Sequence, residues 1–211
     1  QEGVLQRLQA VFNDPTGEGL SAVMDQLFQG FQQLSVSPTD PAVRFTVADA
    51  GARVGQTMQL MRGRLDQIKA DLTTEIRQRV SEANQLISQI AALNGQIVTE
   101  RATSSPNDLF DQRDTLVTRL AQIAGVSQTD RNDGSVQLAL TGTGVLLVDG
   151  VSAFSLAATV NGGTDSVDLT AGGSLAVLPK SGQLSALLEA RNLGNGAIKQ
   201  AATDLDTLAA S

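Results

Sequence analysis

The chain has 211 residues, of which 41% are hydrophobic and 3% aromatic, and its formal net charge is −7. This length can bury a substantial core, while the acidic balance argues against nucleic acid or an anionic membrane surface as a partner, because phosphates would repel the chain. The sequence contains no His and no Cys, which excludes catalytic triads, thiolate nucleophiles, disulfides and imidazole metal sites.

Helical patterns reach both ends of the chain. Apolar residues recur at helical spacing over residues 4–12 and again over residues 198–208. A natural boundary would normally show a capping residue or a polar tail at these places. We therefore expect the chain to be the central piece of a longer protein.

A second helix is predicted after the helix-breaking segment 13–17. Its apolar residues fall in one arc of about 140° when successive residues are placed ~100° apart. They are Leu20, Val23, Met24, Leu27, Phe28, Phe31 and Leu34. Residues 37–41 then turn the chain into the next element.

Residues 41–101 carry one uninterrupted helical pattern, called the rod here. Its apolar positions run from Val43 to Ile97 in steps of three or four residues, and Gly51 and Asn94 occupy two places on the same stripe. The mean step of about 3.6 residues is that of a straight α-helix, so the pattern predicts a rod of roughly 90 Å.

The rod's first turn is marked by Asp40, which can cap free N–H groups, and by Pro41, which suits the first helical position. Gly63 is the place where a break in the rod stays open, because glycine weakens a helix interior.

A shorter helix is predicted after the rod. Ser105 is a natural N-cap, Pro106 is the first helical residue, and Gly125 ends the helix. One face is apolar, so the helix is expected to fold back on the rod as a helical hairpin. The residues of this face are Leu109, Leu116, Leu120 and Ile123.

Arg113 falls on the apolar face of this helix. Its neighbours at three and four residues are apolar, so no acid at those positions can pair with it, and Asp111 and Asp114 are expected to point elsewhere. Two interpretations remain open. Arg113 extends along its aliphatic stem to solvent, or it joins this helix to the rod or the terminal helices from an at least half-buried position.

From Val126 to Leu178 the helical pattern disappears and Gly, Thr, Ser and Val dominate. Asp133-Gly134 and Asp149-Gly150 are hairpin turn signals. Short strands are predicted at residues 136–140, 145–148, 154–156, 167–169 and 175–178. From Gln183 a helix resumes, and we expect it to continue to the end of the chain.

These patterns predict an α+β fold: an elongated helical bundle built on one long rod helix, with a small inserted antiparallel β unit. We expect residues 1–125 to form the helical body, residues 126–180 the β unit, and residues 181–211 a returning helix that packs on the body.

No motif for catalysis, cofactor binding or metal binding stands out. Gly142-Thr143-Gly144 lacks the third glycine and the Lys-Ser/Thr of phosphate-binding loops. Residues 130–134 resemble the start of a calcium loop, but Gly134 takes the fifth position, where an oxygen ligand is required. No apolar run approaches the roughly 20 residues that span a bilayer. We therefore predict neither an enzyme nor a metal- or cofactor-binding protein, and no nucleic-acid or membrane partner.

The segment 107–114 is the most informative part of the sequence. Its order, N-D-L-F-D-Q-R-D, resembles the N-D-L-L-D-Q-R-D signature of the flagellar hook-associated protein 1 family. Seven of its residues are singled out as a structural motif: Asn107, Asp108, Leu109, Asp111, Gln112, Arg113 and Asp114.

Further features follow the family in order over nearly the whole chain. They are residues 11–15 with 19–21, residues 38–42, residues 132–136 with 147–150, and residues 182–184 with 187–191. Members of this family are longer at both ends, which agrees with the helical patterns that reach both ends here.

The resemblance implies an extracellular structural subunit at the hook–filament junction of the bacterial flagellum, exported through the flagellar channel. Its implied partners are other copies of itself, the hook protein and the second junction protein, which it meets through terminal segments that this chain lacks. The chain alone is then expected to be a monomer, because its apolar helix faces are used internally.

Two other classes of protein stay open at this point. An elongated coiled-coil translocator or adhesin-like protein of another secretion system would share the rod but not the ordered motifs. A cytoplasmic helical scaffold or sensor module would share the helices, but the inserted β unit would be unusual in it.

Overall fold

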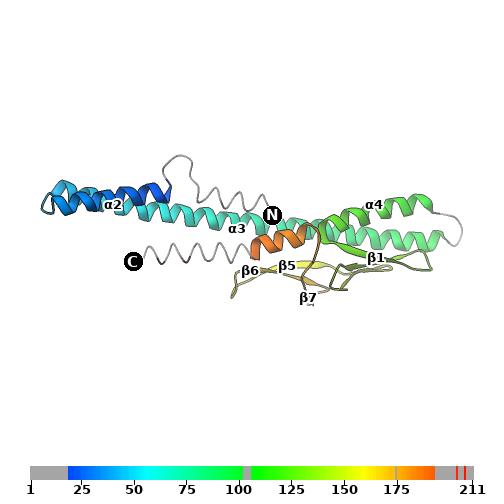
Figure 1. Cartoon of the computed structure of the whole chain (residues 1–211). Helices are drawn as coiled ribbons and strands as arrows, with labels where there is room; N and C mark the ends of the chain where they lie inside the picture. Colours follow the sequence, from blue (N-terminus) through cyan, green and yellow to red (C-terminus); the bar gives the residue numbers. More distant parts are fainter. Residues whose placement is uncertain (1–18, 102–105, 174, 193–202, 204–206, 208–211) are drawn as a thin grey trace. The chain divides into compact units, whose positions relative to one another are not determined.

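The computed structural model of the chain describes residues 19–101, 106–173, 175–192, 203 and 207 (Figure 1). The helices expected over 4–12 and 198–208 lie outside the described residues, apart from two isolated positions. The described helices are α2 (Leu20–Val36), α3 (Pro41–Glu100), α4 (Asn107–Ala124) and a helix over residues 182–192. None of them is long and apolar enough to cross a membrane.

The rod is confirmed as a single helix of 60 residues, and no break occurs at Gly63. The Asp40 side chain caps its start, because the backbone N–H of Ala42 donates to Oδ1 at 2.8 Å. One position on the predicted stripe is wrong: Gly51 is exposed, and Ala50 is buried instead. Ala50 follows Val47, whose side chain contacts Gly30 of α2, by three residues, so the two lie on the same face of α3.

The chain divides within α3 into two compact units, the first including the residues up to Asp71 and the second running from Leu72 to Asn195. In the first unit, Val23 of α2 shares a small core with Val54, Met58, Met61 and Leu65 of α3. Glycine at position 30 permits close approach, because a Cβ there would lie 3.1 Å from the Val47 side chain.

The apolar arc of α2 is only partly used in this contact. Phe28 and Phe31 are 57% and 50% exposed. The expectation that the apolar helix faces are used up internally is therefore wrong for α2. The reason is geometric: among the described residues α2 packs on α3, and one helix covers a narrower strip than the predicted arc.

The second unit contains seven described strands in two antiparallel sheets, with the orders β1-β2-β3-β4 and β5-β6-β7. Their bounds are β1 Val126–Asp130, β2 Val136–Leu140, β3 Leu146–Asp149, β4 Ser152–Ala153, β5 Leu156–Asn161, β6 Ser166–Ala171 and β7 Leu175–Val177. In Figure 1 the strands lie along the C-terminal half of α3.

Both sheets share one hydrophobic core with the helices. Ile87 and Ile90 of α3, Leu120 of α4 and Leu184 of the helix 182–192 are buried together with the inner faces of β2 and β6. The α+β class is confirmed. The strands are nevertheless no separately packed insertion, because the same side chains form the core of helices and sheets.

The strands predicted at 136–140, 145–148, 167–169 and 175–178 are confirmed as β2, β3, β6 and β7, with bounds that differ by up to two residues. β2 matches its predicted bounds, whereas β5 begins at Leu156, where the predicted strand 154–156 should end. β1 and β4 were not predicted. All but the first residue of β1 are exposed, so this strand carries no two-residue apolar alternation.

Candidate structural site at the contacts between helices and sheets

Asn94 is the polar residue most deeply placed in the second unit. Its side chain lies on the apolar stripe of α3 and is 0% exposed. Nδ2 donates to the carbonyl oxygens of Val136 at 3.0 Å and Gly150 at 2.7 Å, and Oδ1 accepts from the Val136 N–H at 3.2 Å. One amide thus holds the start of β2 and the turn after β3 against α3.

Asn84 and Asn192 repeat this pairing on the second sheet. The Asn84 amide donates to the Leu156 carbonyl and accepts from its N–H, both at 2.8 Å. Asn192 makes the same pair of bonds with Val167, at 3.0 and 2.9 Å. Each side-chain amide donates one hydrogen bond to a strand residue and accepts one from it, as the backbone of a neighbouring strand would. The backbone groups of Leu156 and Val167 that face a helix therefore have hydrogen-bond partners.

Arg191 ties the helix 182–192 to two other segments from a position that is 3% exposed. Nε donates to the Thr73 hydroxyl on α3 at 3.0 Å. The two Nη atoms donate to the carbonyl and the carboxylate of Asp165, at 2.8 and 3.0 Å. Asp165 lies in the turn between β5 and β6 with a positive φ of 52°.

Arg113 serves the first sheet in a similar way. It is 5% exposed, and Nη1 donates to the Gly134 carbonyl at 2.7 Å. Burial and a bond to another segment are therefore confirmed, and the solvent-exposed alternative is wrong. The expected partner is also wrong, because Arg113 binds the turn between β1 and β2 rather than the rod or a terminal helix.

The surroundings of Arg113 correct a second expectation. Asp114 does not point elsewhere, since its Oδ1 lies 3.5 Å from Nη2 of Arg113. The guanidinium also lies 5.1 Å from the centre of the Phe110 ring. Nε is buried and has no acceptor among the described residues, so Arg113 is incompletely satisfied.

Arg113→Ala should lower the free energy of unfolding by about 2 kcal/mol, because the Gly134 carbonyl loses its charged donor. Removal of the buried, unpaired Nε offsets part of this loss. The measurement is urea unfolding followed by circular dichroism, with the exposed neighbour Gln112→Ala as the matched control. An unchanged midpoint for Arg113→Ala would show that the contact with the turn contributes nothing to stability.

The motif residues therefore divide into two sets. Arg113 is buried and Leu109 is partly buried, whereas the five remaining motif residues are exposed on the outer side of α4. These are Asn107, Asp108, Asp111, Gln112 and Asp114.

An ion-pair network joins α3 to α4. Glu82 accepts from Nε of Arg119 at 2.8 Å and from Nη1 of Arg79 at 3.0 Å. The hydrogen bond from Arg119 is the main cause that holds the pKa of Glu82 below its ordinary value of 4.5, and partial burial opposes it.

Glu82→Gln should lower the free energy of unfolding at neutral pH by about 1 kcal/mol, since solvent screens this part-exposed network. The folded pKa lies below the unfolded one, so the stabilisation is complete above the unfolded pKa and is lost as pH falls through the folded pKa. The urea midpoints of parent and variant should therefore differ at about pH 7 and converge at about pH 3. A gap of equal size at both pH values would contradict this, and Asp111→Asn is the control.

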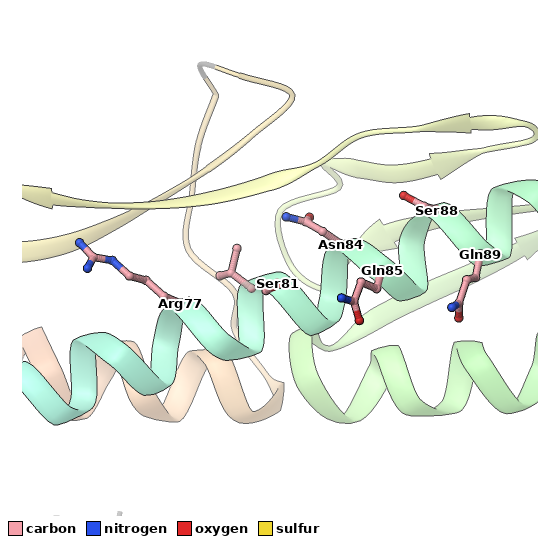
Figure 2. A pocket seen from close by; sticks show the side chains of 7 residues that line it. Arg77, Ser81, Asn84, Gln85, Ser88 and Gln89 are labelled. Carbon is pink, nitrogen blue, oxygen red and sulfur yellow. The ribbon is translucent and has the colours of Figure 1, made fainter.

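An open groove of about 610 Å³ runs along α3. Figure 2 shows its polar lining, which comes from successive turns of this one helix and includes Arg77, Ser81, Gln85 and Ser88. Asn84 is also labelled there, and its amide is already engaged by Leu156. In the described part of the chain no group of three acidic, His or Cys side chains could hold a metal ion.

Two glycines allow the chain to pass close to itself where it enters the strands after α4 and where it leaves them before the helix 182–192. Gly125 follows α4 with a φ of 57°, and Gly182 opens the last helix with a φ of 86°. A Cβ at Gly182 would lie 2.7 Å from the Gly125 nitrogen and from the Ile123 carbonyl oxygen. Only glycine fits this crossing without displacing the backbone.

The family model of the flagellar hook-associated protein FlgK helical domain matches residues 5–211. The chain belongs to this family. Among its relatives is flagellar hook-associated protein 1 of Bacillus subtilis, 29% identical over 64% of this chain and 27% of that protein. The protein of the same name from Salmonella typhimurium is 37% identical over 66% of this chain and 26% of that protein.

A solved structure also resembles this FlgK family member. The flagellar hook junction protein FlgK from Burkholderia pseudomallei superposes with a TM-score of 0.75 at 27% identity, over 89% of this chain and 35% of that one. The chain thus spans about a third or less of the length of each of these proteins.

Sequence reasoning missed most of the residues that join the sheets to the helices in this family member. The sequence places Asn94 on the apolar stripe without a role, and Arg191 lies in the predicted helix that begins at Gln183. A polar side chain within an apolar stripe was the available signal, and it was used only for Arg113. Asn84 and Asn192 gave no comparable signal, because both lie at the edge of an apolar face.

Proposed function

We propose that the full-length protein is a structural subunit at the junction between the hook and the filament of the bacterial flagellum. The observation that carries this proposal is the match of one hook-associated family over nearly the whole chain. The relatives are named flagellar hook-associated protein 1, and the similar structure is that of a hook junction protein.

The geometry of the second unit supports a mechanical role. Buried amides and guanidiniums link helices to strand backbones and turns, and one core is shared by both sheets and the helices. Such contacts resist relative movement of the layers, since moving them would leave buried polar groups unpaired. A subunit between two filamentous structures has to transmit torque without yielding.

The remaining parts of the proposal follow from the family. The subunit meets copies of itself, the hook protein and the second junction protein, is exported through the flagellar channel and acts outside the cell. It performs no catalysis. A translocator or adhesin-like protein of another secretion system, or a cytoplasmic scaffold, is not favoured, because neither would share the family match.

The chain alone should be a monomer, with assembly depending on segments of the full-length protein outside it. Two half-exposed phenylalanines on α2 offer roughly 200 Å² per copy. Two copies that paired through them would bury roughly 400 Å² in total, well below the ~1,000 Å² that a specific interface needs. Light scattering at tens of micromolar should give the mass of one chain. A stable dimer would contradict this, and its loss in Phe28→Ser would place the contact on α2.

The function is tested in a bacterium that lacks its own hook-associated protein 1. The full-length gene should restore filaments attached to hooks, counted by electron microscopy, whereas a gene encoding only this chain should not. Hooks that stay bare with the full-length protein, expressed and exported at normal level, would refute the proposed role.

A further inference from the structure

Three asparagines in the sequence are followed directly by glycine: Asn94, Asn161 and Asn195. An Asn-Gly pair is chemically labile, because glycine has no Cβ that would shield its main-chain nitrogen from the asparagine side chain. Asn195 lies outside the described residues. The structure places the other two in opposite surroundings, and these surroundings decide which of them can react in the folded chain.

The fold protects Asn94. Its amide is fully buried and donates to the carbonyls of Val136 and Gly150. The next nitrogen, that of Gly95, lies inside α3, where hydrogen bonds of the helix hold the main-chain N–H groups. These N–H groups point along the helix axis, so the Gly95 nitrogen reaches the Asn94 side chain only if this part of the helix unfolds.

Asn161 is the last residue of β5 and begins the exposed turn to β6. The N–H of the next residue, Gly162, has no acceptor among the described residues. A Cβ placed on Gly162 would meet nothing within 4 Å, so water can reach this part of the main chain. The Gly162 nitrogen can therefore lose its proton to solvent without first breaking a hydrogen bond.

The turn also polarises the Asn161 side chain. Its Oδ1 accepts from the N–H of Gly163 at 3.0 Å and, more weakly, from that of Thr164 at 3.4 Å. A nucleophile that attacks Cγ places negative charge on Oδ1, and donors already directed at this oxygen stabilise that charge. Nδ2 donates to Oδ2 of Asp168 at 3.1 Å, which keeps Oδ1 directed into the turn.

We propose that Asn161 is a site of spontaneous deamidation in the folded protein, assisted by its own turn. The Gly162 nitrogen gives its proton to water and forms a bond to Cγ of Asn161, Nδ2 takes up a proton and leaves as ammonia, and a succinimide ring remains. Water then adds to either carbonyl carbon of the ring and opens it, which leaves an aspartate or an isoaspartate. Water is the only reactant required.

The products should loosen the hairpin between β5 and β6. An aspartate has a carboxylate oxygen where the NH₂ group of Asn161 donates to Asp168, so attraction becomes repulsion. An isoaspartate routes the main chain through Cβ and Cγ and removes from it the carbonyl that accepts from the Asp165 N–H at 2.7 Å. Because Arg191 binds Asp165, the modification also reaches the contact with the helix 182–192.

Peptide mass spectrometry of the folded chain, kept in mildly alkaline buffer, tests the proposal. Fragmentation assigns the modified position and separates aspartate from isoaspartate. We expect Asn161 to react at least about tenfold faster than Asn94, which reacts only from opened states, while both should react at similar rates in urea. Equal rates in the folded chain would overturn the proposal, and so would an Asn161 that reacts in urea but stays intact in the folded chain.

Gly162→Val is the matched control variant. The φ of Gly162 lies outside the positive region that valine avoids, and the added side chain has room, so the fold should accept it. The branched side chain covers the attacking nitrogen, and the rate at Asn161 should fall at least about tenfold. An unchanged rate would refute attack by this nitrogen.

The effect on the hairpin is measured on the same samples. The urea midpoint of the parent should fall as the modified fraction grows, whereas that of Gly162→Val should stay constant over the same time. A parent that is fully modified at Asn161 and keeps its original midpoint would refute the loosening of the hairpin.

Discussion

Asn94→Ala should lower the free energy of unfolding by about 3–5 kcal/mol, the largest effect expected of any substitution considered for this chain. The variant leaves three backbone groups of the first sheet without partners: the N–H and the carbonyl of Val136 and the carbonyl of Gly150. The site is fully buried, so water replaces the amide only if the sheet moves away from α3.

The measurement for Asn94→Ala is urea unfolding of the isolated chain, with Gln96→Ala two residues away on the exposed face of α3 as the matched control. Asn94→Asp tests the donor separately. It keeps the oxygen that accepts from the Val136 N–H, but it replaces the NH₂ group that donates to two carbonyls with a second acceptor oxygen. It should be no more stable than Asn94→Ala at neutral pH. A loss below about 1 kcal/mol in both variants would show that the amide is not essential.

Arg191→Ala should lower the free energy of unfolding by about 3 kcal/mol, because breaking a buried charged network by removing one partner leaves the others desolvated. Three bonds disappear together, one to Thr73 and two to Asp165. The helix 182–192 would then lose its polar connection to both α3 and the turn between β5 and β6.

Arg191→Lys distinguishes a charge effect from a geometric one. Lysine retains the charge but cannot reach one hydroxyl, one carbonyl and one carboxylate with a rigid planar fork. It should therefore recover less than half of the loss, while Arg77→Ala, an exposed arginine on α3, should unfold at the parent midpoint. Full recovery by lysine would mean that charge alone matters at this position.

The sequence was sufficient to predict the helices that extend over many turns. An apolar stripe that stays in phase from Val43 to Ile97 favours one continuous helix over a break at Gly63, and Asp40 marks its start. The burial of Arg113 could be predicted for a related reason, since a charge within such a stripe needs a partner. Its actual partner, the Gly134 carbonyl, could not, because the turn lies 21 residues away and its carbonyl direction depends on a positive φ.

The joining residues of the sheets could not be predicted from local pattern alone. Asn84 and Asn192 pair with strand residues 72 and 25 positions away in the chain, and only the folded arrangement brings them together. The exposure of Phe28 and Phe31 has the opposite cause, since a local pattern marks a face as apolar without stating how much of it a neighbour covers.

Hydrogen exchange of three backbone amides tests most directly whether side-chain amides hold the sheets on the helices as one cooperative unit. The N–H groups of Val136, Leu156 and Val167 donate to Asn94, Asn84 and Asn192. We predict that all three N–H groups exchange only through global unfolding of the second unit, as the amides between β1 and β2 do. Exchange of the three as fast as that of exposed turn amides, with the strand ladders still protected, would contradict the account.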